Sequence, residues 1–346
     1  MKELDNATEV TQRDVISHIF APLFTAHGKA IFNPQKPQGQ AFAPTNIALC
    51  KYWGKRNQTL NLPMTNSLSV ALPTLGANTT ITPLYGAHDL ITLNQTDIKL
   101  DSAFAQRLIT FVDLFRVPRK QFFHFDITMN IPVAAGLASS AAGFASITLA
   151  LDDLFAWNLP KQVLSVLARL GSGSAARSIW NGFVEWQSGA RPDGMDSHGV
   201  PLDVTWPHLY IGILPISQYE KPISSRVAMQ RTVDSSMFYS VWPKKVAHDL
   251  PLLKMAIEKK HFPLLAGTAE SNSLNMHATM LSSWPPICYF YPGTIAAMQR
   301  VWTLREEGLE LYFTQDAGPN LKLIFESENV EIVREHFPDV ECVRLF

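Results

Sequence analysis

The stretch NIALCKYWGKR, residues 46–56, gathers residue types that can bind an anion. An aromatic pair and a glycine stand among three cations: Tyr52, Trp53 and Gly54 among Lys51, Lys55 and Arg56. A surface lysine usually serves solubility alone, but this interleaving is more typical of a turn that holds an anionic group. The apolar residues just before it indicate a strand that would fix the turn in place.

A second stretch, RLGSGSAARSIWNGFVEW at residues 169–186, suits a phosphate group. Ser172 and Ser174 alternate with glycines and offer hydroxyl and backbone donors, and Arg177 follows three residues after Ser174. Arginine is permanently charged and can bind two phosphate oxygens at once. A flexible Gly/Ser linker is the alternative, but a linker would not lead directly into an apolar aromatic segment.

A third stretch, PVAAGLASSAAGFAS at residues 132–146, runs into an apolar segment, with no charge between Ile131 and Asp152. A membrane span needs about 20 predominantly apolar residues, and the serines, the glycines and Pro132 argue against one. The favoured interpretation is a strand, a small-residue loop and a buried helix that begins near Ser139 and Ser140. Free N–H groups at such a helix start make an anion site. Tight packing through small residues stays open as the alternative.

Two further stretches place polar groups at turns. LYFTQDAGPNLKLIF, residues 311–325, predicts two strands joined at DAGPN, with Asp316 at the end of the first. A turn-forming aspartate explains that residue as well as a catalytic one does. KPISSRVAMQRT, residues 221–232, sets hydroxyls beside cations, which is also common in surface loops.

The composition is that of a globular protein. The chain has 346 residues, of which 47% are hydrophobic and 17% charged, with a formal net charge of −1. This balance argues against bulk binding of nucleic acid or of an anionic membrane. The length predicts two domains or lobes, because single cores stop growing near roughly 250–300 residues.

The cysteines and histidines predict neither a disulfide framework nor a transition-metal site. Cys50, Cys288 and Cys342 are far apart and form no CxxC pair, and the ten histidines form no HxxxH or HxH pair. A reducing cytoplasm fits this pattern.

The N-terminal segment predicts an amphipathic helix over residues 15–24. Its acidic start followed by apolar residues is the opposite of a secretory signal. Apolar residues recur there at helical spacing: Val15, Ile16, Ile19, Phe20, Leu23 and Phe24. We interpret it as a docking extension rather than a membrane-surface helix, because its basic face is weak.

Together these motifs resemble the mevalonate diphosphate decarboxylase family of the GHMP kinase superfamily. NIALCKYWGKR, LPMTNSLSV, PVAAGLASSAAGFA, GSGSAARSIWNGFVEW and FTQDAGPN stand in the family's order over residues 41–346, and ESNSLNMHATMLSSWPP, residues 270–286, resembles its late helix and turn. The sequence departs from the family at Thr65, Asn181 and Ala228, which stand where Asn, Gly and Gly are usual. None of these changes removes a charged catalytic group.

The resemblance implies a role for each matched position. Asp316 and Lys51 correspond to the catalytic aspartate and lysine. The ATP-phosphate loop corresponds to Ala135, Gly136, Leu137, Ala138, Ser139, Ser140 and Ala141. The substrate-binding positions are Tyr52, Trp53, Gly54, Lys55, Ser172, Gly173, Ser174, Ala175, Ala176 and Arg177, with Ser225 and Arg226 from a loop over Ser224–Met229. Glu185 is interpreted as structural, and no protein ligand of a metal is assigned.

The resemblance also implies the fold and the reaction. The fold is α+β with two lobes, a ribosomal protein S5 domain 2-like N-terminal lobe and a GHMP C-terminal lobe. The predicted divisions are an extension over 1–40 and lobes over 41–205 and 206–346. The implied reaction is ATP-dependent decarboxylation of (R)-mevalonate 5-diphosphate to isopentenyl diphosphate, with Mg²⁺ on the ATP, in a cytoplasmic homodimer.

Two rival functions remain at this stage. A sister kinase or decarboxylase would act on mevalonate or its monophosphate, and a non-catalytic GHMP-fold protein would bind without turnover. The presence of both Lys51 and Asp316 favours the decarboxylase over both rivals. Because every motif lies after residue 40, the sequence also predicts that residues 1–40 are dispensable for activity.

Overall fold

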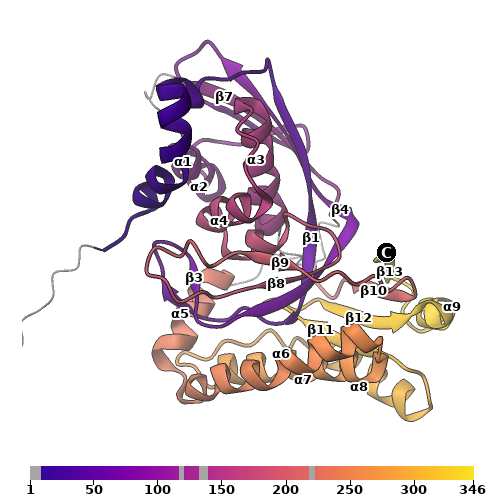
Figure 1. Ribbon diagram of the computed structural model, residues 1–346. Coiled ribbons are helices and arrows are strands. Elements are labelled where there is room, and N and C mark those ends of the chain that lie inside the picture. The colour runs from indigo at the N-terminus through magenta and orange to yellow at the C-terminus, as the bar shows by residue number, and fades with distance from the viewer. Residues whose placement is uncertain (1–8, 117–120, 132–138, 218–222) are drawn as a thin grey trace, which may run out of the picture.

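The computed structural model describes residues 9–116, 121–131, 139–217 and 223–346 (Figure 1). Within these residues the chain folds as two lobes, each built on a mainly antiparallel sheet with helices packed against it. This is the α+β class predicted from the sequence. The predicted loop residues Ala135–Ala138 lie outside the described residues.

The first lobe is built on a seven-stranded sheet in the order β6-β5-β7-β4-β8-β9, with β1 paired to β4. The pairing of β1 with β4 is antiparallel and breaks register after Pro44, where a bulge bends the strand. The strands are β1 (Gly39–Cys50), β4 (Ser67–Leu84), β5 (Leu90–Leu93), β6 (Thr96–Asp97), β7 (Phe122–Met129), β8 (Phe183–Trp186) and β9 (Gly199–Pro201), with a separate hairpin of β2 (Lys55–Asn57) and β3 (Leu62–Pro63).

Helices cover one face of this sheet (Figure 1). The central one, α3 (Ser139–Phe155), is mainly apolar, and most of its described side chains are buried between the sheet and the other helices. This confirms the buried helix and, with β7, the strand predicted before it. The other helices are α1 (Gln12–His27), α2 (Ala103–Val112) and α4 (Lys161–Gly171), with the short 3₁₀ helices η1 (Gly28–Phe32) and η2 (Gly173–Arg177).

The N-terminal helix α1 is part of the first lobe's core. A capping box begins it, in which the Thr11 hydroxyl accepts from the backbone of Asp14 while the Asp14 carboxylate accepts from the backbone of Thr11. Phe20 is fully buried, with its ring centroid 4.7 Å from that of Trp157. The predicted helix therefore exists and docks on the first lobe. Because it supplies side chains to the core, we expect it to stabilise the fold. That residues 1–40 are dispensable for activity stays a prediction.

The second lobe is built on a four-stranded sheet in the order β11-β12-β10-β13. Its first strand begins at Leu209, shortly after the predicted division at residue 205, which stays a prediction. The strands are β10 (Leu209–Leu214), β11 (Tyr312–Gln315), β12 (Leu321–Glu326) and β13 (Glu341–Arg344). The helices are α5 (Ser225–Ser235), α6 (Trp242–Lys259), α7 (Phe262–Leu281), α8 (Pro292–Glu306) and α9 (Val330–His336), with η3 (Met237–Val241) and η4 (Ser327–Asn329).

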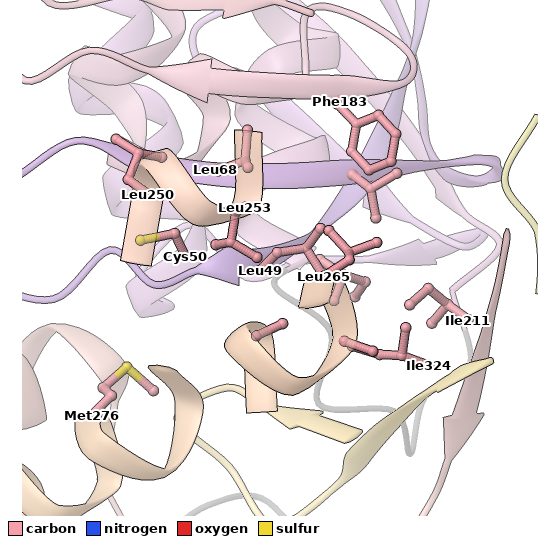
Figure 2. Close-up of a cluster of buried hydrophobic side chains, with 14 of the residues drawn as sticks. Leu49, Cys50, Leu68, Phe183, Ile211, Leu250, Leu253, Leu265, Met276 and Ile324 are labelled. Atoms are coloured by element: carbon pink, nitrogen blue, oxygen red, sulfur yellow. The ribbon is translucent and has the colours of Figure 1, made fainter. Parts of the chain in front are cut away.

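One hydrophobic cluster joins the two lobes, as Figure 2 shows. Leu49 and Cys50 of β1 and Leu68 of β4 meet Leu253 of α6 and Leu265 of α7 there. All five are buried. The C-terminal end of β1, where Lys51 follows, is thereby fixed against the second lobe, so catalytic groups from both lobes can meet at this joint.

Candidate active site

Asp316 lies between two buried lysines at the joint of the lobes. Its Oδ1 is 2.7 Å from Lys51 Nζ and its Oδ2 is 3.6 Å from Lys322 Nζ. Each lysine side chain is 2% exposed, whereas that of Asp316 is 26% exposed. Burial alone would raise the pKa of the carboxyl, but the two lysines outweigh it and hold the pKa well below its ordinary value. The result is a charged carboxylate that a bound molecule can reach.

Strand geometry positions the two partners of Asp316 from different directions. Asp316 follows β11 directly, as predicted, and Lys322 is in the next strand, β12, where it pairs in register with Thr314. Lys51 follows β1, and its backbone N–H donates to Asn272 Oδ1 at 2.8 Å. Asn272 in turn donates to the buried Asp249 at 2.8 Å. Helix α7 therefore holds the end of β1 through a side-chain amide.

Arg177 is a buried cation held by neutral acceptors. Its guanidinium donates to Asn46 Oδ1 at 3.2 Å, to Ser69 Oγ at 3.0 Å and to the Ser67 hydroxyl. It lies 5.9 Å from the ring centroid of Trp186. Within the described residues it forms no ion pair, and burial lowers its pKa to about 10. A buried positive charge without an anionic partner fits a site for an anionic ligand.

The turn from Tyr52 to Lys55 links β1 to the β2–β3 hairpin. Gly54 has a φ of +100°, and a Cβ there would collide with the Tyr239 hydroxyl, so the turn requires glycine. Among the described residues the buried hydroxyl of Tyr52, beside Gly173, has no hydrogen-bond partner. Trp53 is only 2% exposed and belongs to the core cluster between the lobes. Its ring is used in core packing, and its assignment to the substrate-binding turn stays a prediction.

The GSGSAAR stretch forms the end of α4 and the 3₁₀ helix η2. Ser172 Oγ lies 3.3 Å from Ser140 Oγ, so the two predicted phosphate-binding segments meet here. Ser139 begins α3, and Ala141 is fully buried inside that helix. The methyl groups of Ala175 and Ala176 are also fully buried, so their side chains serve packing and cannot contact a substrate. Among the side chains of these segments, the described hydroxyls and the Arg177 guanidinium are the groups that can meet phosphate oxygens.

The segment predicted as a loop over Ser224–Met229 is a helix start instead. Ser224 is the N-cap of α5 and accepts from the backbone N–H of Val227. Ser225 and Arg226 stand in its first turn, and Arg226 is exposed. Short polar residues predicted a loop because serine favours both loops and helix caps.

Arg226 lines a cavity of about 470 Å³ that also includes Arg107 of α2 and Gly171, the residue before Ser172. Burial, Arg226 and Arg107 together lower the pKa of Lys55 to about 8. Lys55 donates to Asn61 Oδ1 at 2.7 Å, and Arg107 Nε is buried without an acceptor among the described residues. Two cations from different elements therefore line this space, and a third, Lys55, interacts electrostatically with both, an arrangement that suits a polyanion.

Sequence reasoning missed Lys322 and Arg107. Lys322 had a signal, since a lysine in the middle of the apolar run LKLIF is unusual unless its charge has a buried partner. Arg107 had none, because α2 shows only an ordinary helical pattern. Glu185, interpreted as structural, accepts from Asn66 at 2.8 Å and pairs with Lys254 at 2.7 Å.

These features define a two-lobed GHMP-kinase-type fold with a site at the joint of its lobes. The model of the diphosphomevalonate decarboxylase-like N-terminal domain matches residues 43–199, and that of the mevalonate 5-diphosphate decarboxylase C-terminal domain matches residues 211–343. The chain belongs to the diphosphomevalonate decarboxylase family.

Individual relatives agree with this assignment. A diphosphomevalonate decarboxylase of Candida albicans is 35% identical over 86% of this chain and 88% of its own length. The mevalonate diphosphate decarboxylase of Staphylococcus aureus aligns with a TM-score of 0.83 and 34% identity, over 90% of this chain and 96% of that one. A solved structure of MDDEF in complex with MVAPP, AMPPCP and magnesium aligns with a TM-score of 0.82 and 37% identity. The alignment covers 89% of this chain and 96% of that one.

The described residues contain neither a membrane-crossing helix nor a cluster of metal-ligating side chains. No described helix combines the length and the apolar character that a membrane crossing requires. No group of three or more His, Cys, Asp or Glu in the described ranges could hold a metal ion.

Proposed function

We propose that this protein decarboxylates (R)-mevalonate 5-diphosphate to isopentenyl diphosphate at the expense of ATP. The observation that carries the proposal is the arrangement of Asp316 between Lys51 and Lys322, with Arg177 nearby, at the joint of the two lobes. Its substrate class is that of its relatives, among them the structure with MVAPP.

The tertiary 3-hydroxyl of the substrate must first become a leaving group. Its oxygen forms a bond to the γ-phosphorus of ATP while the bond from that phosphorus to the β-phosphate oxygen breaks and releases ADP. Asp316 orients the hydroxyl and accepts its proton. Because the pKa of Asp316 is well below its ordinary value, orientation and negative charge are its main contributions, with proton transfer late in the step. Lys51 neutralises charge on the transferring group.

Elimination then follows without a further protein base. The bond from C3 to the phosphorylated oxygen breaks, and inorganic phosphate leaves with the electron pair. The carbon–carbon bond to the carboxylate breaks, CO₂ leaves, and its electron pair forms the alkene. The buried guanidinium of Arg177 stabilises the anionic groups in this water-poor space.

The diphosphate of the substrate needs donors and cations. We assign this role to Lys55, Ser172, Arg177, Arg226 and the newly found Arg107. Support comes from the cavity that Arg107 and Arg226 line and from the lowered pKa of Lys55, which burial lowers first and the neighbouring cations Arg226 and Arg107 lower further. A diphosphate would relieve that repulsion.

ATP phosphates would lie at the start of α3, beside Ser140 and Ser172. Mg²⁺ binds oxygen ligands and commonly keeps phosphates and waters as most of its shell. The described site offers hydroxyls, and its one carboxylate is already paired with two lysines. These residues fit an ion that is held chiefly by ATP and touched by the serine hydroxyls. When bound, it neutralises phosphate charge.

The decisive experiment measures all products of one reaction. The protein is incubated with ATP, Mg²⁺ and mevalonate 5-diphosphate, and CO₂, ADP, phosphate and isopentenyl diphosphate are quantified. Equal amounts of the four support the proposal. ADP formation without CO₂ would show a kinase. If the protein turned over mevalonate monophosphate but not the diphosphate in a parallel incubation, the monophosphate would be its substrate.

The remaining assignments are the lobe division at residue 205, a cytoplasmic location and a homodimer. Support for the location is that all three cysteines are free, Cys50 buried and Cys288 exposed. The homodimer rests on family resemblance, and light scattering coupled to gel filtration tests it.

A further inference from the structure

Lys322 differs from Lys51 in how it is held. It is the second residue of strand β12, in register with Thr314 of β11, the strand that Asp316 follows. Its ammonium is 3.6 Å from Asp316 Oδ2 and donates to the carbonyl of Asn320 at 3.3 Å. Lys51, in contrast, stands just beyond the end of β1 and reaches Asp316 from the other lobe. Lys322 and Asp316 therefore come from one pair of adjacent strands and the turn between them, whereas the contact of Lys51 with Asp316 crosses between the lobes.

The charges around Asp316 are unevenly balanced. Lys51 faces it from β1, Lys322 from β12 and Arg177 from η2. The buried His277 of α7 is the fourth titratable group, and burial and Lys51 lower its pKa to about 3, so it is neutral at physiological pH. If Lys51 were the sole counter-ion, drawing it toward an anionic phosphoryl group would leave Asp316 uncompensated in a buried site.

We propose that Lys322 is the permanent counter-ion of Asp316, a positioning residue that keeps the carboxylate charged and oriented so that Lys51 is free to serve the transferring phosphoryl group. The inference rests on the proposed function for its catalytic meaning. The ion pair itself does not, because Asp316 directly follows β11, Lys322 is in the paired strand β12, and the two groups meet without substrate. Lys322 touches no reacting atom and acts through Asp316.

The test replaces Lys322 by methionine, which keeps much of the chain length and removes the charge. Loss of an opposite charge at this distance should raise the pKa of the Asp316 carboxyl by about 1–3. We expect kcat at pH 7 to fall roughly 10- to 100-fold, with KM for both substrates within about threefold of wild type. The loss should deepen as pH falls, because a raised pKa protonates the carboxylate earlier.

Two comparisons make the result specific. Lys36→Met is the matched control, since Lys36 also pairs with an aspartate, Asp153, but on the surface, and neither residue belongs to a site motif. It should keep wild-type kcat and its pH dependence. Should Lys322→Met fail to fold, Lys322→Gln removes the same charge and retains a donor for the Asn320 carbonyl.

A readout without turnover separates this inference from the proposed function. The ¹³C signal of the Asp316 carboxyl, assigned by its loss in Asp316→Asn, is followed on acidification to about pH 4.5, near the ordinary carboxyl range. It should stay constant in wild type and begin to move in Lys322→Met. If the wild-type protein were inactive but its carboxyl signal stayed constant while that of Lys322→Met moved, the proposed function alone would be refuted. An unchanged carboxyl titration, or a variant with lower melting temperature but unchanged kcat and pH profile, would overturn the role of Lys322.

Discussion

Replacing Asp316 by asparagine removes the one negative charge between Lys51 and Lys322 and keeps the size of the side chain. An amide cannot accept the proton of the substrate hydroxyl, so we expect kcat to fall by about 10³–10⁴, the upper range for general-base groups. KM should stay within about threefold, because the diphosphate contacts are made by other residues. Steady-state ADP release and CO₂ release measure both constants.

The same substitution leaves two buried ammonium groups without a partner. Breaking a buried ion pair in this way costs about 3–5 kcal/mol of stability, or roughly 4–7 °C in melting temperature for a chain of this size. The lysines can escape part of that cost by releasing protons. Their folded pKa values would then lie below those of the unfolded chain, so the unfolded state binds more protons and stability rises with pH.

The free energy of unfolding of the Asp316→Asn variant should therefore rise between pH 7 and about pH 9, by up to about 1.4 kcal/mol per pH unit for each lysine. Its melting temperature should accordingly approach that of wild type over this range. Asp153→Asn is the matched control, because Asp153 pairs with a lysine on the surface. A folded variant that keeps more than about a tenth of wild-type kcat would refute the reasoning, since that loss is less than about 1.4 kcal/mol of barrier.

Three other substitutions or deletions have distinct expected outcomes. Arg177→Ala should raise KM for the diphosphate substrate about 10- to 100-fold and lower the melting temperature, because Asn46 and the two serines lose their donor; unchanged substrate affinity would contradict its assignment. Asn272→Ala should lower both kcat and melting temperature, since the Lys51 amide and Asp249 each lose a partner worth about 1–3 kcal/mol; wild-type kcat would show that the end of β1 is held by other contacts. Deletion of residues 1–40 should prevent folding, because each buried side chain of α1 contributes about 1.5–3 kcal/mol. Circular dichroism measures this, and a folded, active truncation would contradict it and agree with the prediction made from the sequence.

The sequence predicted local features well because they depend on neighbouring residues. The apolar helix α3, the strand at β7 and the two strands flanking Asp316 all follow from short-range patterns. The motif order also placed Lys51 and Asp316 in one site. Their 2.7 Å contact joins residues 265 positions apart, which no local pattern encodes.

The features that the sequence did not predict depend on what covers a segment. Trp53 looked available beside three cations, but the joint core between the lobes encloses it. The serines at the start of α5 were compatible with a loop and with a helix cap, and only the rest of the helix decides between them. The apolar face of α1 predicted docking but not its partners, Trp157 and the neighbouring phenylalanines.

The hydrophobic cluster shared by the lobes has a consequence for synthesis of the chain. Leu49 and Leu68, made early, are covered by Leu253 and Leu265, which are made about 200 residues later. At about 5–20 residues per second, residues 206–346 take roughly 10–30 s to emerge. During that interval the nascent first lobe exposes an apolar face, which makes it a client for ribosome-associated chaperones. Once complete, the two lobes share their core and should melt together in a single calorimetric transition.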